Sequence, residues 1–264
     1  MNLNKLLRHR QYLMYWLTSR IRKLLRLNTG DDECDWEVYH HHYQAEQAEI
    51  EKVNTLVLSP GDYAFSGGSL FLESKILPLH PNYRLLYETI LQLNPRTVLE
   101  IGCGGGDHLF NLNVLAPAIG LYGRDRSAGQ LAFLRRRHPG LRAEIAQLDV
   151  TLPYSTRWPV VELAFTQAVI MHIHTGNDHY EAISNLLRTA TKYVVLMENW
   201  ERHNFMQIIN ELRKTNRILW KELFFYYRRS PELDKPHLMV VSSVELPYET
   251  LTDYNVLRAH VSNA

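Results

Sequence analysis

Short apolar runs alternate with amphipathic segments along the chain from residue 83 onward. The apolar runs predict strands at 97–101, 119–123, 143–147, 160–165 and 193–197, and the segments between them predict helices at 83–93, after residue 107, and at 127–137, 178–191 and 204–214. This alternation is typical of a parallel sheet built from βαβ units. Two further β-like runs, 219–227 and 238–244, predict an antiparallel hairpin at the C-terminal end of an α/β chain.

The first 55 residues follow a different pattern. Apolar residues recur at helical spacing through residues 3–25, and residues 1–28 hold seven Lys and Arg and no acid, whereas residues 31–51 are strongly acidic. We predict an N-terminal helical extension, 1–55, made of a basic amphipathic helix followed by an acidic helix. The basic helix, residues 1–28, could pack on its own domain, join a homodimer, or dock on a partner or on anionic lipid, and the sequence leaves these alternatives open.

Residues 56–82 carry Pro60-Gly61, Gly67-Gly68 and two further prolines, a composition typical of a loop. A loop of this length inside a compact domain usually has a function, so we expect a lid or substrate loop here. The candidates for a lid that excludes water are Tyr39, Tyr43, Tyr63, Phe65, Gly67 and Gly68.

The composition of the chain argues against several classes of function. The 264 residues are 45% hydrophobic and 22% charged, enough to bury a core, and the net charge of +1 makes a nucleic-acid partner unlikely. Two cysteines and no uninterrupted apolar run of about 18–20 residues favour a cytoplasmic protein, with peripheral contact at the inner membrane face left open for residues 1–28. Adjacent histidines at 40–42 point in three directions around a helix, so we expect no metal site.

The stretch from Val98 to Asp107 carries the most chemical information, because a buried strand runs into four glycines and then a helix. Glycines allow positive φ and a close backbone approach, so a cofactor should lie across this turn. A nicotinamide dinucleotide would place its pyrophosphate where Asp107 stands, and no Walker lysine is present. Glu100 and Asp107 instead suit a cation such as the ammonium and sulfonium of S-adenosylmethionine.

These residues resemble the class I S-adenosylmethionine-dependent methyltransferases. The first motif of that family, E/D-x-G-x-G-x-G, is matched by Glu100, Gly102, Gly104 and Gly106, and the family's further motifs are similar to Gly123–Ser127, Leu148–Val150 and Glu162–Ile173. The resemblance covers residues 83 to 199 and implies a Rossmann-like, doubly wound sheet of seven strands in a domain spanning 83–264. It also implies that S-adenosylmethionine is the cofactor. Glu162 departs from the family, which usually has Asp there.

The resemblance assigns roles to individual residues. Asp125 would hold both ribose hydroxyls, although Arg124 and Arg126 beside it could compete for its carboxylate. Asp149 would accept from the adenine amino group, or it caps a loop. The cofactor-binding positions that we expect are Glu100, Gly102, Cys103, Gly104, Gly106, Asp125, Arg126, Asp149, Val150 and Gln167. Gln167 either lines the pocket or satisfies backbone groups, and Cys103 is a small residue within the turn.

The sequence indicates the methyl donor more clearly than the methyl acceptor. Similar small-molecule O-methyltransferases carry a histidine able to act as base where His172 stands, so His172 is the candidate catalytic residue, with His174 as an alternative and a structural role open. A loose resemblance around 172–199 to enzymes of nucleotide-sugar and polysaccharide pathways favours a hydroxyl on a sugar, glycan or other small molecule. The alternatives are an RNA or protein methyltransferase, or a pseudo-enzyme that acts as an interaction module.

Overall fold

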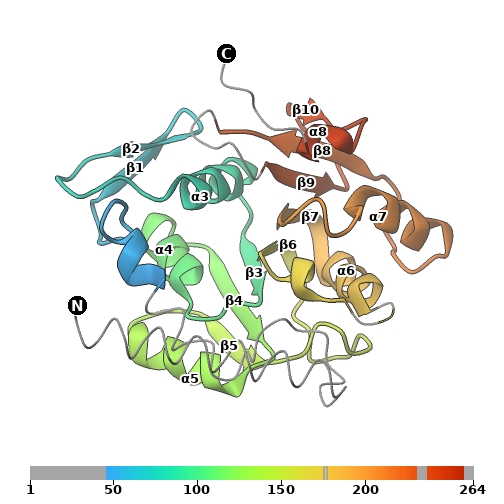
Figure 1. Cartoon of the computed structure of the whole chain (residues 1–264), viewed down its shortest axis with the longest axis horizontal. Helices are drawn as coiled ribbons and strands as arrows, with labels where there is room; N and C mark the ends of the chain where they lie inside the picture. The colour runs from blue at the N-terminus through green and yellow to red at the C-terminus, as the bar shows by residue number, and fades with distance from the viewer. Residues whose placement is uncertain (1–45, 175, 177, 231–236, 259–264) are drawn as a thin grey trace, which may run out of the picture.

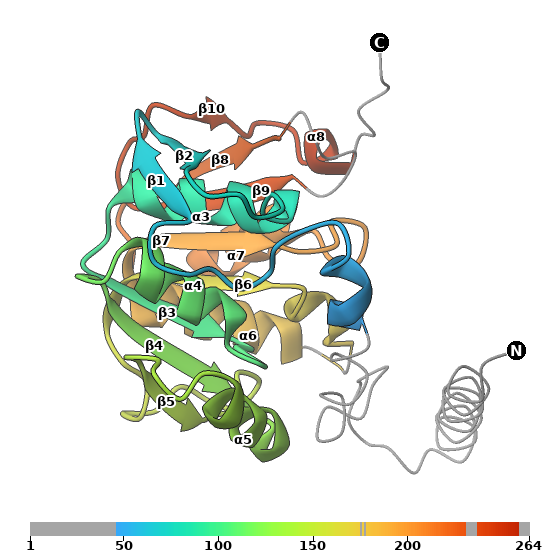
Figure 2. The ribbon, with the colours of Figure 1, turned by 90° about the vertical axis from the view of Figure 1, so that its left-hand side faces the viewer.

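A single eight-stranded sheet forms the centre of the molecule (Figures 1 and 2). This computed structural model describes residues 46–174, 176, 178–230 and 237–258. The strands are β3 (Thr97–Ile101), β4 (Gly120–Asp125), β5 (Glu144–Gln147), β6 (Val161–Gln167), β7 (Ala190–Met197), β8 (Phe224–Arg228), β9 (Leu238–Ser242) and β10 (Glu249–Thr250). They lie in the order β10-β8-β9-β7-β6-β3-β4-β5.

The first five of these strands in the chain, β3 to β7, run parallel, and β8, β9 and β10 are antiparallel to their neighbours. The predicted α/β class, parallel sheet and C-terminal hairpin are therefore confirmed. The sheet has eight strands where we expected seven, because the two-residue strand β10 pairs with β8 at the edge.

Helices cover both faces of the sheet. Figure 1 shows α3 (Pro81–Leu93), α4 (Asp107–Leu115) and α5 (Ala128–Arg137) on one side, and α6 (Asp178–Thr189) and α7 (Phe205–Lys214) on the other. Each side has its own cluster of buried apolar side chains, with α3, α4 and α5 contributing to one and α6 and α7 to the other. This is the doubly wound arrangement that the sequence predicts.

Local signals set where the helices begin. Pro81 occupies the first turn of α3, and the His80 ring accepts a hydrogen bond from the Asn82 backbone N–H. Ser127 caps α5 in the same way through its hydroxyl, and Asn204 caps α7 through its side-chain carbonyl. A proline in the first turn lets α3 start two residues before the predicted boundary.

Residues 63–72 differ from the prediction of a loop. They form a hairpin of β1 (Tyr63–Ser66) and β2 (Ser69–Leu72), which pair antiparallel around Gly67-Gly68. The hairpin is attached to α3, since Gln92 donates to the Gly68 carbonyl and Arg84 donates to the Leu70 carbonyl at 3.2 Å.

Other short elements are the 3-10 turn η1 (Ile170–His172), the helix α8 (Asn255–Arg258) and a helical stretch at 46–50, within the predicted acidic helix. The predicted basic helix at 1–28, Tyr39, Tyr43 and the histidines at 40–42 lie outside the described residues. Within the described part of the chain, no helix is both long and apolar enough to cross a membrane.

Candidate active site

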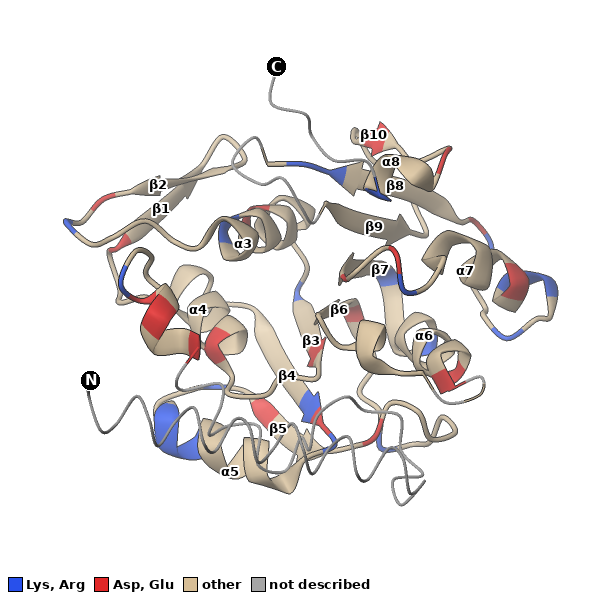
Figure 3. Cartoon of the chain, viewed as in Figure 1, with Lys and Arg blue, Asp and Glu red and all other residues tan. Residues whose placement is uncertain are grey.

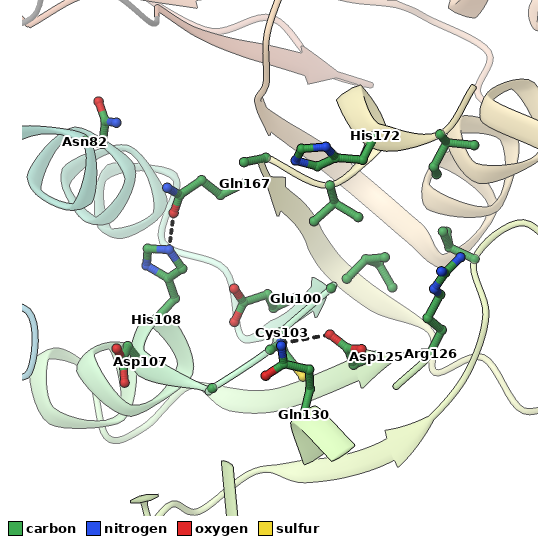
Figure 4. A pocket seen from close by; sticks show the side chains of 18 of the residues that line it. Asn82, Glu100, Cys103, Asp107, His108, Asp125, Arg126, Gln130, Gln167 and His172 are labelled. Atoms are coloured by element: carbon green, nitrogen blue, oxygen red, sulfur yellow. Dashed lines mark hydrogen bonds between the residues drawn. The ribbon is translucent and has the colours of Figure 1, made fainter. Parts of the chain in front are cut away.

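A cavity of about 410 Å³ opens at the carboxyl ends of β3, β4 and β6 (Figure 4). Parallel strands deliver their C-terminal residues to one edge of the sheet, and the cavity lies at that edge. Ten of the eleven predicted site residues line it: Glu100, Gly102, Cys103, Gly104, Asp125, Arg126, Asp149, Val150, Gln167 and His172.

Gly106 is the exception among the predicted binding positions, because it does not line the cavity. It is the residue before α4 and has φ 82°, and a Cβ there would lie 2.6 Å from Cγ of Leu134. The position requires glycine for backbone conformation and for packing against α5.

The glycine turn leaves its backbone exposed to the cavity. Gly102 has φ 71°, and a Cβ on it would lie 2.4 Å from a methyl carbon of Val169, so the turn and the β6 loop approach each other closely. The Gly104 N–H donates to Oδ2 of Asp125 at 2.9 Å, and the Ser127 N–H donates to Oδ1 at 2.8 Å. Asp125 therefore fixes the turn as well as lining the cavity.

Glu100 is a buried carboxylate at the end of β3, and only 3% of the residue is exposed. Its Oε2 has no hydrogen-bond partner within the described structure. Burial raises the pKa of Glu100 well above its usual value, and the nearby Asp107 and Asp125 raise it further. A buried carboxylate is costly without a partner, so this site favours a cationic ligand.

Asp107 does not offer an unpaired carboxylate to a cationic ligand. This corrects our expectation that Asp107 acts together with Glu100. Nε of Arg137 donates to Oδ1 of Asp107 at 2.6 Å, Nε2 of His138 lies 2.7 Å from the same oxygen, and Gln47 also donates to the carboxylate. Burial raises the pKa of Asp107, but the hydrogen bonds from His138 and Arg137 outweigh burial and leave the pKa lowered. The charge of Asp107 is thus balanced within the protein.

The two arginines beside Asp125 also have other partners. Arg124 is buried and donates to Oε1 of Glu144 at 2.6 Å, so it does not compete for Asp125. For Arg126, burial lowers the pKa and the charge of Asp149 opposes that shift. Oδ1 of Asp149 accepts from the N–H of Thr151 at 2.9 Å, so Asp149 caps the following loop while it lines the cavity.

Solved structures share this fold. The crystal structure of the methyltransferase domain of bacterial CtHen1-C matches with a TM-score of 0.51 and 17% identity, over 61% of this chain and 96% of that one. This chain has the class I methyltransferase fold. The sheet order and the glycine turn after its first parallel strand agree with that assignment.

Two other similar structures match at lower scores. The plantazolicin methyltransferase BpumL in complex with SAH has a TM-score of 0.45 at 13% identity, over 60% of this chain and 79% of that one. CalS10, an amino pentose methyltransferase from Micromonospora echinaspora with SAM bound, has a TM-score of 0.40 at 18% identity, over 46% of this chain and 51% of that one. No protein-family model and no curated protein sequence matches the chain.

In this methyltransferase fold, His172 lies on η1 and lines the cavity. The loop that carries it is held by Glu198, which accepts from the Thr166 hydroxyl at 2.7 Å and from the Met171 N–H at 3.0 Å. The exposed His174, the alternative base, does not line the cavity, and its ring lies 5.9 Å from that of His203. Of the two histidines, His172 is the one with access to the cavity.

The four lid candidates among the described residues do not line this cavity. Tyr63, Phe65, Gly67 and Gly68 belong to the β1–β2 hairpin, and none of them lines it. Within the described structure, the N-terminal side of the cavity is lined by Ile50, Leu56, His80, Asn82 and Tyr83. The hairpin is bonded to α3, whereas Leu56 and His80 of the predicted lid or substrate loop, 56–82, line the cavity, so a lid role for this segment stays a prediction.

Glu162 does not line the cavity either. Its carboxylate accepts from the backbone N–H of Arg96 at 2.9 Å and from Nζ of Lys192 at 3.0 Å. These hydrogen bonds, with the Arg96 backbone contributing most, lower the pKa of Glu162 to about 2. Glu162 stabilises the start of β6, so its departure from the family pattern does not touch the site.

His108 is a cavity residue that the sequence did not reveal. It is buried on α4, its Nδ1 lies 2.9 Å from the Tyr87 hydroxyl, and its Nε2 bonds Oε1 of Gln167. Burial lowers the pKa of His108 to about 4 despite the nearby charge of Asp107, so the ring is neutral at pH 7. Its partners lie 21 and 59 positions away, and a single sequence carries no signal for such contacts.

A second cavity of about 260 Å³ adjoins the first. The two share Asn82, Gln167 and Ala168. The second cavity is otherwise lined by Met171, Met197, Glu198, Asn199, Trp200, Glu201, Leu257 and Arg258. It gives the fold a separate space, partly apolar and partly polar, next to the glycine-turn cavity. Within the described residues, no group of three or more His, Cys, Asp or Glu is arranged to hold a metal ion.

Proposed function

We propose that this protein is an S-adenosylmethionine-dependent methyltransferase that transfers the methyl group to a hydroxyl of a small molecule or sugar. Glu100 is the observation that carries this proposal. Its buried Oε2 has no partner among the described residues and is matched in charge by the ammonium of S-adenosylmethionine. A pyrophosphate in the same cavity would instead meet this carboxylate as a like charge.

The other cavity residues fit the same group. The Asp125 carboxylate can accept hydrogen bonds from two ribose hydroxyls, and Asp149 can accept from an adenine amino group. The exposed backbone of Gly102 and Gly104 lets the ligand lie close to the turn. When bound, S-adenosylmethionine supplies a methyl carbon that its sulfonium already activates.

The chain's own task is then to orient the acceptor, exclude water and accept a proton. His172 is suited to accept the hydroxyl proton, since a neutral imidazole acts as a base near pH 7. Met171, Met197 and Trp200 line the second cavity and would keep water away from the acceptor. Asn82 lines both cavities and can hydrogen-bond the acceptor beside the methyl donor.

Size and charge support a small acceptor. The second cavity, about 260 Å³, matches a sugar or another small metabolite better than a folded macromolecule. In Figure 3, Lys and Arg are interspersed with Asp and Glu along the described ribbon, apart from the basic run Arg135-Arg136-Arg137 at the end of α5. A cytoplasmic location, with residues 1–28 contacting a membrane or a partner, belongs to the same proposal and rests on the sequence pattern alone.

The experiment has two stages. In the first, thermal unfolding is followed with S-adenosylhomocysteine and, separately, with NAD⁺. We expect Tm to rise only with S-adenosylhomocysteine, and a rise only with NAD⁺ would overturn the cofactor assignment.

In the second stage, release of S-adenosylhomocysteine from S-adenosylmethionine is measured with a panel of monosaccharides, nucleotide sugars, catechols, peptides and short RNAs. Turnover with a hydroxyl compound supports the proposed acceptor class, and turnover confined to RNA or peptide overturns it. Cofactor binding without turnover on any acceptor would favour a pseudo-enzyme.

A further inference from the structure

A line of buried polar side chains runs from the backbone before β1 to the cavity. It begins at Asn111 on α4, whose Oδ1 accepts from the Leu58 N–H at 2.8 Å. Nδ2 of Asn111 donates to the Leu56 carbonyl at 2.7 Å. A backbone N–H can only donate and a carbonyl can only accept, so these two contacts fix which end of the Asn111 amide is which.

The orientation of the Asn111 amide determines the direction of the next hydrogen bonds, which involve the Tyr87 hydroxyl. Its Nδ2 also donates to the Tyr87 hydroxyl at 2.9 Å, and that hydroxyl lies 2.9 Å from Nδ1 of His108. Tyr87 already accepts from Asn111, and His108 Nδ1 is the one acceptor near its hydroxyl hydrogen in the described structure. Tyr87 is fully buried, so an unpaired hydroxyl would be costly, and the hydroxyl must donate to His108.

The tautomer of His108 follows from this donation. Since Nδ1 accepts a hydrogen bond, the neutral ring carries its hydrogen on Nε2. Nε2 then donates to Oε1 of Gln167, as drawn in Figure 4. The amide group of Gln167 is thereby oriented with Nε2 and its two hydrogens away from His108, and the residue lines both cavities.

The charges around the cavity indicate what this donor is for. The amino-acid end of S-adenosylmethionine carries a carboxylate next to its ammonium, so the carboxylate must lie near Glu100. Of the described residues that line the cavity, Arg126 is the only Arg or Lys, and it lies toward Asp149. Among the described lining residues, a neutral donor must therefore bind the carboxylate, and Figure 4 shows His108 between Gln167 and Glu100.

We infer that Asn111, Tyr87 and His108 are positioning residues that hold Nε2 of Gln167 as the hydrogen-bond donor for the carboxylate of S-adenosylmethionine. This inference rests on the proposed function. It explains why a histidine, a tyrosine and an asparagine are buried together behind the cavity: each fixes the direction of the next hydrogen bond.

The test compares two ligands that differ in one group. S-adenosylmethionine and its decarboxylated analogue, which retains the amine and the sulfonium, are titrated calorimetrically into the full-length protein. The measured quantity is the carboxylate ratio, defined as the Kd of the decarboxylated analogue divided by the Kd of S-adenosylmethionine. A hydrogen bond to a charged group predicts a carboxylate ratio of about 10 or more for the wild type.

Gln167→Met keeps the length of the side chain and removes the donor, so the carboxylate ratio should fall at least about fivefold while the affinity for the analogue stays within about twofold. Gln130→Met is the matched control. Gln130 lines the same cavity on α5 but takes no part in the line of buried hydrogen bonds. Its substitution should leave the carboxylate ratio unchanged, even if both affinities fall.

Two pairs of measurements distinguish residues that position Gln167 from residues that only stabilise the fold. His108→Gln retains a donor toward Gln167 and should keep most of the carboxylate ratio, whereas His108→Leu should lower it as far as Gln167→Met does. Nitrogen-15 chemical shifts of the His108 ring should show hydrogen on Nε2 in the wild type, and Tyr87→Phe should shift the ring toward a mixture of tautomers. A structural role alone would leave the carboxylate ratio of His108→Leu equal to that of the wild type.

The outcomes are distinct. A wild-type carboxylate ratio near 1, the same carboxylate ratio in Gln167→Met as in the wild type, or hydrogen on Nδ1 of His108 would each overturn the inference while leaving the proposed function in place. If the protein binds neither ligand, the proposed function fails and this inference fails with it.

Discussion

The substitution Glu100→Gln should stabilise the free protein and weaken cofactor binding at the same time. Glu100 is buried, and its Oε2 has no partner in the described part of the chain. Burial, Asp107 and Asp125 all raise the pKa of this carboxyl. A neutral amide of the same shape removes the cost of a buried charge, but it also removes the partner for an ammonium.

The size of the stabilising effect follows from proton linkage. The unfolded chain releases the Glu100 proton near the ordinary pKa of about 4.3, while the folded protein holds it to higher pH. Between these values the folded state binds more protons, so stability falls as pH rises. From pH 4.3 to pH 7 the loss cannot exceed about 4 kcal/mol, because each pH unit contributes about 1.4 kcal/mol.

At pH 7, therefore, we expect Glu100→Gln to raise Tm by at least about 3 °C, and the difference from the wild type should vanish near pH 4. The affinity for S-adenosylhomocysteine should fall at least about tenfold, measured by calorimetry. Glu198→Gln is the matched control. Burial also raises the pKa of Glu198, but its carboxylate accepts from the Thr166 hydroxyl and the Met171 N–H. The loss of these hydrogen bonds should outweigh the gain from proton linkage, so this substitution should lower Tm.

A lower Tm for Glu100→Gln in the free protein at pH 7 would mean that the carboxylate is stabilised by a partner and would refute this reasoning. An unchanged affinity for S-adenosylhomocysteine would show that Glu100 does not bind the ammonium. A Tm difference that is the same at pH 4 and pH 7 would exclude the linkage explanation even if the Tm itself rises.

Three further predictions concern the turn, the ion pair and the base. Gly102→Ala places a Cβ 2.4 Å from Val169 at φ 71° and should abolish S-adenosylhomocysteine binding, whereas Gly61→Ala, at φ 89° with nothing within 4 Å, should cost only about 1–2 kcal/mol in urea unfolding. Asp107→Asn leaves Arg137 and His138 without their carboxylate and should lower stability by about 2–4 kcal/mol while changing S-adenosylhomocysteine affinity less than about threefold; a larger loss of affinity would restore Asp107 as a ligand. His172→Ala should reduce kcat about 100-fold or more with little change in cofactor Kd, and unchanged turnover at saturating cofactor would remove His172 from the mechanism.

The sequence alone was sufficient to predict the strand ends and the turn that line the cavity. The run from Thr97 to Ile101 is apolar and β-branched, and it forms β3 with the predicted boundaries. The glycines after it require positive φ, which identifies the turn without knowledge of any contact. The order of acidic residues at strand ends then places Glu100, Asp125 and Asp149 around one cavity, because parallel strands share an edge.

Long-range polar pairing could not be predicted in the same way. Asp107 begins α4 as expected, yet its charge is balanced by Arg137 and His138 about 30 positions away, and nothing in the local sequence distinguishes that state from an unpaired acid. The β1–β2 hairpin was missed for a related reason: its glycines and prolines are typical of loops, and its packing depends on contacts with Arg84 and Gln92 of α3. Local composition predicts where turns form, but it does not predict which distant residues they contact.

The features that lower the stability of the free protein lie where the cofactor is proposed to bind. Glu100 is buried with Oε2 unpartnered in the described structure, and Gly102 and Gly104 hold a turn in the left-handed region at the same edge of the sheet. A core selected only for stability would replace such a carboxylate by an apolar side chain, since a buried charge without a partner lowers stability. At equal ligand concentration, binding that supplies the missing cation should therefore stabilise the wild type more than Glu100→Gln, because the wild type binds the cation more tightly. A Tm rise in Glu100→Gln equal to that of the wild type at the same ligand concentration would show that the Glu100 carboxylate contributes nothing to binding.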